Sequence, residues 1–256
     1  DGFHFELSPS YHCDVFEDLM DCYIFLENSS IKKTLYRKLY NMAIVIKSFT
    51  YNDGYISLFN DGGIHMASNP NSLLTKYNEI FKINIFNENE RLSFEKSGYF
   101  VVKNKLFHLI YDSGNVGPDE LPAHAHGDIF SFELSVKKQR VFVDAGVFEY
   151  NSGLKRSLSR ATKSHNTLTI NDMDQCEFWS SFRIAKRAKV EVEKIKRSKK
   201  QFYIRSKHDG YKNLDGNPIH QRILKCNDMG EIDIHDRVIG GKNQKIVSRI
   251  LLHPEI

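Results

Sequence analysis

The spacing of hydrophobic side chains changes once along this chain of 256 residues, from a helical repeat to a strand repeat. Within residues 14–46, apolar side chains recur every three or four positions and form two stripes, which predicts two amphipathic helices packed against each other. Ser8 suits the cap of the first helix and Pro9 its first position. Tyr11 is therefore expected in the opening turn of that helix, at the positive end of its dipole.

A polar segment over residues 50–70 predicts a long loop, and a short helix is expected around 71–82. From about Gly98 onward the repeat becomes two residues. Apolar and polar side chains alternate over 130–136, and a polar turn leads into 141–143, which predicts a hairpin. The pattern predicts an α+β chain whose second part is a layered antiparallel β domain. Further strands are expected over 99–103, 106–111, 167–170, 202–205, 220–225, 231–238 and 246–252.

Composition and charge narrow the classes of function. A hydrophobic content of 41% over 256 residues is enough for one large domain, or parts of two, with a buried core. The net charge of +4 is small, so no nucleic-acid partner is expected, and attraction to another polyanion would depend on the local arrangement of charges. The apolar runs are far shorter than the ~20 residues of a membrane-spanning helix, which predicts no membrane insertion.

Three smaller features of the sequence are also informative: the spacing of the cysteines, one basic cluster and the two ends of the chain. The four cysteines show no C-x-x-C spacing and are expected to be free thiols. The basic cluster Lys194–Lys200 is interpreted as a solvated strand edge or turn. The chain opens at Asp1 without a methionine and stops at Ile256 within strand-like sequence. We therefore expect a longer protein, truncated at both ends, whose oligomeric state the sequence does not indicate.

Histidines and carboxylates recur near the ends of the predicted strands. His124 and His126 are two positions apart, so in an extended segment both side chains face the same way. Asp144 follows one strand and His165 precedes another. Because imidazole and carboxylate groups are ligands that zinc favours, this set predicts a metal site with one histidine left over for chemistry.

The carboxylate ligand of this site is not settled by spacing. In a flat hairpin, Asp144 would lie opposite Phe132, roughly 20 Å from His126. Spacing alone therefore favours Asp128 as the ligand. Asp144 can serve only if the chain before Asp128 bends back over the sheet, which Gly127 permits.

Four other side chains each have two interpretations. Tyr11 either begins the apolar stripe that continues at Val15, or places a phenol where a helix dipole favours an anion. Arg156 and Arg160 either bind a carboxylate or sulfate through paired hydrogen bonds or form surface salt bridges. Trp179, the only tryptophan, either packs in the core or offers a face to a sugar ring. Core packing is the favoured interpretation of Trp179.

The motifs together resemble the heparinase II/III family of polysaccharide lyases over nearly the whole chain. Each fragment alone is weak, but their order and spacing are specific. The matching stretches are Asp1-Gly2, Glu6-Leu7-Ser8-Pro9-Ser10-Tyr11-His12, His124-Ala125-His126-Gly127-Asp128, Val143-Asp144-Ala145-Gly146, Arg160, Ser164-His165-Asn166-Thr167, Asp174-Gln175, His208-Asp209-Gly210-Tyr211, His220 and Arg222.

The resemblance implies a fold and a role for each matching residue. Residues 1–95 would form the C-terminal part of an (α/α) toroid, and 96–256 a large antiparallel, sandwich-like β-sheet domain, with the active site between them. The resemblance favours Asp144 over Asp128 as the metal ligand. Its implied roles are catalytic for Tyr11 and His124, zinc-binding for His126, Asp144 and His165, and substrate-binding for Glu6 and Arg160.

The implied reaction is β-elimination at a uronic acid of an anionic polysaccharide, which gives a 4,5-unsaturated product. Tyr11 would be the general acid, and also the base for one C5 configuration, with His124 as base or charge stabiliser. The asparagine that neutralises the substrate carboxylate in this family would precede residue 1, and a periplasmic or secreted location is implied. Two other functions stay open at this point, a zinc-dependent hydrolase with a metal-bound water as nucleophile and a non-catalytic carbohydrate-binding protein.

Overall fold

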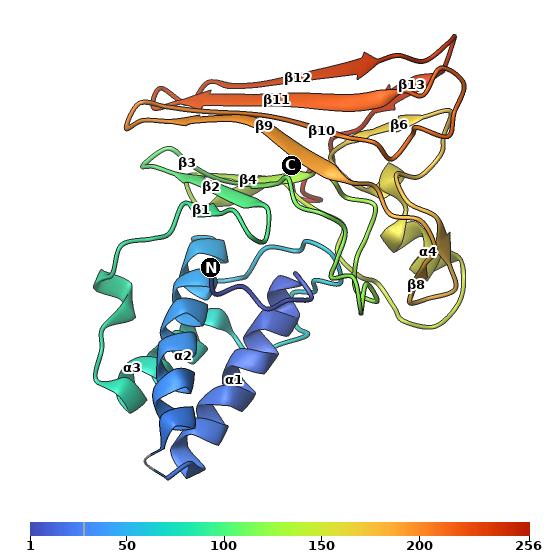
Figure 1. Ribbon diagram of the computed structural model, residues 1–256. Coiled ribbons are helices and arrows are strands. Elements are labelled where there is room, and N and C mark those ends of the chain that lie inside the picture. Colours follow the sequence, from blue (N-terminus) through green and yellow to red (C-terminus); the bar gives the residue numbers. More distant parts are fainter. Residues whose placement is uncertain (28) are drawn as a thin grey trace.

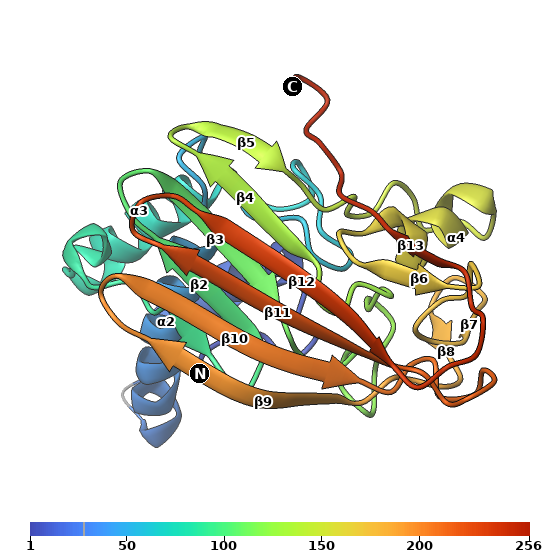
Figure 2. The same ribbon diagram turned by 90° about the horizontal axis from the view of Figure 1, so that it is seen from above.

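The computed structural model describes residues 1–27 and 29–256, and its elements lie in layers (Figure 1). A helical layer packs against a five-stranded antiparallel sheet, and a four-stranded antiparallel sheet covers the opposite face of that sheet. Seen from above, the strands of the two sheets run over one another, and the small elements α4, β6, β7 and β8 lie to one side (Figure 2). This arrangement confirms the predicted α+β fold with a layered antiparallel β part.

The helical layer consists of α1 (Pro9–Phe25), α2 (Ser30–Phe49) and α3 (Pro70–Phe81), which confirms the three predicted helices. Pro9 occupies the first turn of α1 as expected, but the Ser8 side chain makes no capping hydrogen bond. Its hydroxyl instead donates to the backbone carbonyl of Asp61, at 3.0 Å. Ser8 is therefore the N-cap residue, as expected, but its side chain joins the start of α1 to a loop of the site instead of capping the helix.

The first sheet has the order β1-β2-β3-β4-β5 and is the middle layer of the molecule. Tyr99 and Val101 on β2 pack with the helices, whereas Phe100 between them packs with the second sheet. Because both faces of the sheet are covered, β3 is buried at every position. The strands are β1 (Ser93–Phe94), β2 (Tyr99–Lys103), β3 (Phe107–Asp112), β4 (Phe132–Val136) and β5 (Gln139–Phe142), and β4 and β5 form the predicted hairpin.

The second sheet has the order β12-β11-β10-β9. Side chains on β10 and β11 alternate between buried and partly exposed positions, so one face packs on the first sheet through residues such as Phe202 and Leu224. The edge strand β9 is mostly exposed and carries the basic cluster, which confirms its interpretation as a solvated edge and turn. The strands are β9 (Val190–Arg197), β10 (Gln201–His208), β11 (Ile219–Asn227) and β12 (Ile232–Ile239).

Short elements lie beside the two sheets (Figure 2). β13 pairs with β6 and is shorter than the strand expected over 246–252, and the chain then runs along β5, where the His253 N–H donates to the Val141 carbonyl at 2.9 Å. The hydrophobic pattern predicted neither α4 nor the β7 and β8 pair, because each is too short to show a period. The elements beside the sheets are α4 (Leu154–Arg160), η2 (Thr162–Ser164), β6 (Leu168–Ile170), β7 (Phe178–Trp179), β8 (Arg183–Ile184) and β13 (Ile246–Ser248). The short η1 (Ile85–Asn87) lies instead against α2 and α3.

One hydrophobic core joins the helices to the first sheet, because Phe16, Phe49, Phe94 and Ile110 belong to the same buried cluster. The four cysteines are free, as predicted. Within the described residues, no helix is both long and apolar enough to cross a bilayer.

Candidate functional site

The first turn of α1 brings Tyr11 against the loop that carries His124. The centroids of the two rings are 4.1 Å apart, with an interplanar angle of 31°. The Tyr11 hydroxyl also lies 2.9 Å from the Tyr150 hydroxyl, on the segment that follows β5. A phenol from the helical layer and an imidazole from a loop of the β part thus meet, and both side chains are only partly buried.

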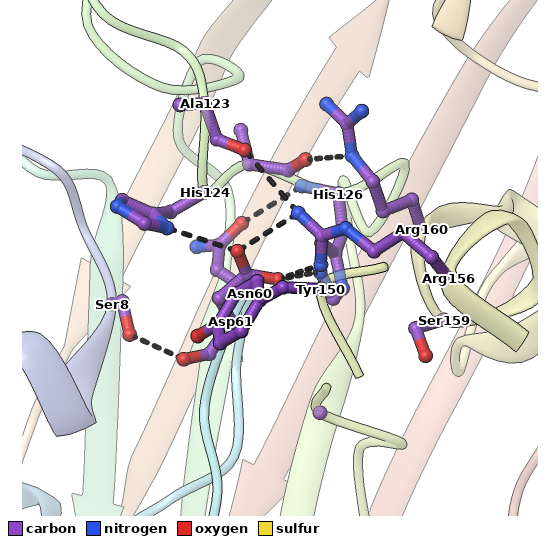
Figure 3. Close-up of polar contacts among 12 residues, drawn as sticks. Ser8, Asn60, Asp61, Ala123, His124, His126, Tyr150, Arg156, Ser159 and Arg160 are labelled. Atoms are coloured by element: carbon purple, nitrogen blue, oxygen red, sulfur yellow. Dashed lines mark hydrogen bonds and ion pairs between the residues drawn. The ribbon is translucent and has the colours of Figure 1, made fainter. Parts of the chain in front are cut away.

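A buried carboxylate, Asp61, lies next to His124 (Figure 3). Its two oxygens contact different histidines: Oδ2 is 2.9 Å from His124 Nδ1, and Oδ1 is 2.8 Å from His126 Nε2. The Arg156 guanidinium donates to both oxygens. Although burial raises the pKa of Asp61, hydrogen bonds from the two histidines and Arg156 hold it below the ordinary value. Arg156 donates to both oxygens and each oxygen also faces a histidine nitrogen, which are the contacts of an ionised carboxylate.

Ionised Asp61 determines which nitrogen of each histidine carries its proton. A carboxylate only accepts hydrogen bonds, so His124 donates from Nδ1 and His126 from Nε2. In a neutral imidazole the other nitrogen then has the lone pair. For His124 this nitrogen is Nε2, which lies 3.8 Å from a carboxylate oxygen of Glu6.

His126, Asp144 and His165 form a buried cluster, the metal triad, whose ligand atoms all lie within 4.8 Å of one another. His126 Nδ1 and His165 Nε2 are buried and have no hydrogen-bond partner among residues 1–27 and 29–256. Buried polar nitrogens without partners are costly, and a cation between them would satisfy both. Burial also lowers the pKa of His126, which favours the neutral, ligating form. The residues present thus fit a metal ion with nitrogen and oxygen ligands.

Asp144, not Asp128, belongs to the metal triad, so the choice based on spacing alone is wrong. The chain turns sharply at Asp128, whose carbonyl accepts from the Ser131 N–H at 2.7 Å, and Phe130 has a positive φ of 70°. His126 is thereby brought back over the sheet. Gly127 permits this path because a Cβ there would lie 2.4 Å from the Thr162 hydroxyl oxygen.

The arginines lie beneath the site and not on its surface. Arg156 is buried and binds Asp61 as described, so the carboxylate that it recognises belongs to the protein. Arg160 is also buried, and its Nε donates to the Ala125 carbonyl between the two site histidines, at 3.2 Å. Arg160 thus supports this loop from below. Glu6, the other residue expected to bind substrate, lies beside His124, with a carboxylate oxygen 3.8 Å from Nε2.

Trp179 is 52% exposed on β7, so the favoured interpretation as a core residue is wrong. The guanidinium of Arg183 lies 4.8 Å from the centre of its ring.

Arg222 is fully buried and donates to Asp236 and to the Phe130 and Asn166 carbonyls. Arg222 therefore supports the two loops that lead to the metal triad.

Asp61 and Tyr150 were missed by sequence reasoning. Asp61 precedes two glycines in a segment that looked like an ordinary loop, and its partner His124 is more than sixty positions away. Tyr150 lies in a segment with no periodic pattern. Neither residue carries a local signal, because each is defined only by contacts across the fold.

The fold and the site define an α+β protein in which a tyrosine and a histidine are in contact at the junction of helices and sheets, beside a buried group of residues that could hold a metal ion. Residues 88–256 match the family described as heparinase II/III-like, C-terminal. The chain belongs to this family, as the sequence resemblance predicted.

Relatives and solved structures agree with this assignment. A heparin-sulfate lyase of Bacteroides thetaiotaomicron is 25% identical over 215 residues, which are 66% of this chain and 30% of that protein. A heparan sulfate lyase mutant from Pedobacter heparinus has a TM-score of 0.77 at 19% identity, over 99% of this chain and 41% of that one. A heparinase III structure has a TM-score of 0.74 at 21% identity, over 94% of this chain and 40% of that one. The chain spans less than half the length of each of these relatives.

Proposed function

We propose that the protein to which this chain belongs is a polysaccharide lyase that cleaves an anionic, uronic-acid-containing polysaccharide by β-elimination. The observation that carries the proposal is the contact of the Tyr11 and His124 rings, 4.1 Å apart, with His124 Nδ1 bound to Asp61. The activity named for the Bacteroides thetaiotaomicron relative, a heparin-sulfate lyase, supports the same reaction class. We also propose that residues 1–95 complete a larger helical toroid.

In the proposed reaction a base removes the C5 proton, its electrons form the C4–C5 double bond, and the C4–O4 bond breaks as O4 takes up a proton. His124 Nε2 has the free lone pair and is the base, and the Tyr11 hydroxyl protonates O4. Glu6, 3.8 Å from Nε2, favours the positive charge that His124 acquires. Negative charge develops on the substrate carboxylate and needs neutralisation, which we assign to an asparagine that would precede residue 1.

We propose that zinc binds to His126, Asp144 and His165, which offer the nitrogen and oxygen donors that zinc takes in proteins. Zinc would supply a fixed anchor for the loops that carry these three residues. The triad side chains are buried, which disfavours a hydrolase in which metal-bound water attacks the polysaccharide. His126 instead reaches the reacting groups through Asp61 and His124.

The experiment that tests the lyase proposal is incubation of the full-length protein with heparan sulfate, alginate and bacterial capsular polysaccharides while the absorbance of the new double bond is recorded. Absorbance should rise with at least one uronate substrate, and its rate of increase should fall strongly in Tyr11→Phe and His124→Ala. Cleavage without unsaturation would establish a hydrolase, and binding without cleavage a carbohydrate-binding protein, so either result would refute the proposal. Cell fractionation tests the proposed periplasmic or secreted location.

A further inference from the structure

Among the residues that the structure describes, Asp61 is the carboxylate that touches both the proposed base and a residue of the metal triad (Figure 3). Each of its two oxygens contacts a different histidine: Oδ2 faces His124 and Oδ1 faces His126. The side chain is completely buried. The backbone of Asp61 is fixed as well, since its N–H donates to the His124 carbonyl at 3.1 Å and its carbonyl accepts from Ser8. The carboxylate therefore has little freedom to adopt another arrangement.

The burial of Asp61 as an anion requires a compensating charge. Arg156 provides this charge by donating to both carboxylate oxygens, and its Nε is held by the Ser181 carbonyl at 2.9 Å. Because the Asp61 side chain is fully buried, neither oxygen faces solvent. A role for Asp61 must therefore be exerted through the two histidines.

Each histidine is oriented by this contact toward a different task. The proton on His124 Nδ1 leaves the lone pair on Nε2, beside Glu6, and the proton on His126 Nε2 leaves the lone pair on the unpartnered Nδ1 within the metal triad. A carboxylate that binds the second nitrogen of a metal-ligating histidine fixes its tautomer. The same hydrogen bond to a catalytic histidine fixes the nitrogen that removes the proton.

We propose that Asp61 is a positioning residue that couples the metal triad to His124, by fixing the tautomer and orientation of both imidazoles with one carboxylate. The expected changes in kcat and KM rest on the proposed lyase function, whereas the expected changes in tautomer and zinc affinity do not. When the metal leaves, His126 is released from its ligand position, the hydrogen bonds at Asp61 rearrange, and His124 loses its fixed orientation. Loss of a metal held by the triad should thus reduce kcat through Asp61 and His124.

The test is Asp61→Asn in the full-length protein. The amide has a single acceptor oxygen and cannot accept from both imidazoles. We expect kcat to fall on the order of a hundredfold and zinc affinity by roughly 10-fold or more. KM should change by less than about threefold, because the Asp61 side chain is fully buried. In the nitrogen NMR spectrum, the His124 proton should move partly from Nδ1 to Nε2.

Asp112→Asn is the matched control. This carboxyl is also buried and accepts from the Gly114 N–H, and among the hydrogen bonds of the described residues it has none to either histidine. Burial raises the pKa of Asp112 well above its ordinary value, so the amide resembles the neutral acid already present. Asp112→Asn should keep the wild-type kcat and the wild-type His124 resonance.

A wild-type kcat in Asp61→Asn, or an unchanged His124 resonance, would overturn the inference. Should Asp61→Asn fail to fold, the wild-type protein provides the test: removal of zinc by a chelator must shift the His124 imidazole resonance, and an unchanged resonance refutes the coupling. If the wild-type protein cleaves no uronate polysaccharide but the resonance shifts, the proposed function fails and the positioning role of Asp61 stands.

Discussion

His12, the neighbour of Tyr11, makes the start of α1 sensitive to acid. Its side chain is buried, with Nδ1 accepting from the His4 N–H and Nε2 donating to the Met42 carbonyl, both at 3.0 Å. Burial lowers the pKa of His12 to about 4. Because a proton on Nδ1 would also break the bond to His4, the folded protein keeps this imidazole neutral. The arrangement holds the turn that presents Tyr11.

The loss of folding stability in acid follows from the difference between the pKa of His12 in the folded chain and its pKa in the unfolded chain. The unfolded chain binds the proton below its model value of 6.5, whereas the folded chain binds it only near 4. The stabilisation is thus complete above about pH 6.5 and is lost as the pH falls toward 4, with a cost of about 2 kcal/mol at pH 5 and about 3 kcal/mol when fully developed. Burial lowers the pKa of His108 to about 3, so His108 contributes in the same direction.

Urea denaturation of wild type and His12→Gln at about pH 7.5 and about pH 5 measures this contribution. Glutamine has no proton to gain, so the free energy of unfolding of His12→Gln should fall by about 2 kcal/mol less than that of wild type between the two pH values. His65→Gln, at an exposed histidine, is the control and should behave as wild type. An equal loss of stability in His12→Gln and wild type would refute the assignment of acid sensitivity to His12.

Two further predictions concern the metal triad and the support of its loops. Zinc should raise the melting temperature of the wild-type protein and have no effect on His165→Ala, because the triad loses a ligand; equal stabilisation of both proteins in a thermal melt would contradict the metal site. Arg222→Leu should lower the free energy of unfolding by about 3–5 kcal/mol, since Asp236 and two carbonyls lose a buried partner. The exposed Arg237→Leu should cost less than about 0.5 kcal/mol in the same denaturation series, and similar losses in both variants would refute this role of Arg222.

Periodic features of the fold could be predicted from the sequence, and features made by long-range contacts could not. The repeat over 14–46 located α1 and α2. The polar turn after residue 136 located the hairpin of β4, although β4 is buried on both faces. The histidines and carboxylates near strand ends also predicted a metal site, and the resemblance selected His126, Asp144 and His165, which the structure brings together. Spacing failed for the metal ligand because it assumed an extended chain through Asp128, where the structure has a tight turn.

Single residues without a pattern were the least predictable. Trp179 is exposed although large aromatic residues usually pack in a core, and no neighbouring sequence marks this exception. Asp61 acquires its role only when α1, the loop at 123–127 and α4 meet around it. The electrostatic centre of the site is therefore a product of tertiary structure.

The convergence of Tyr11 and His124 in one reaction step is tested most directly by a double-mutant cycle. The rate of double-bond formation from a uronate polysaccharide would be measured for wild type, Tyr11→Phe, His124→Ala and the double variant of the full-length protein. Because both groups act in the same elimination, the double variant should lose about as much activity as the more damaging single variant. Losses that multiply in the double variant would show that the two side chains act independently and would contradict the proposed site.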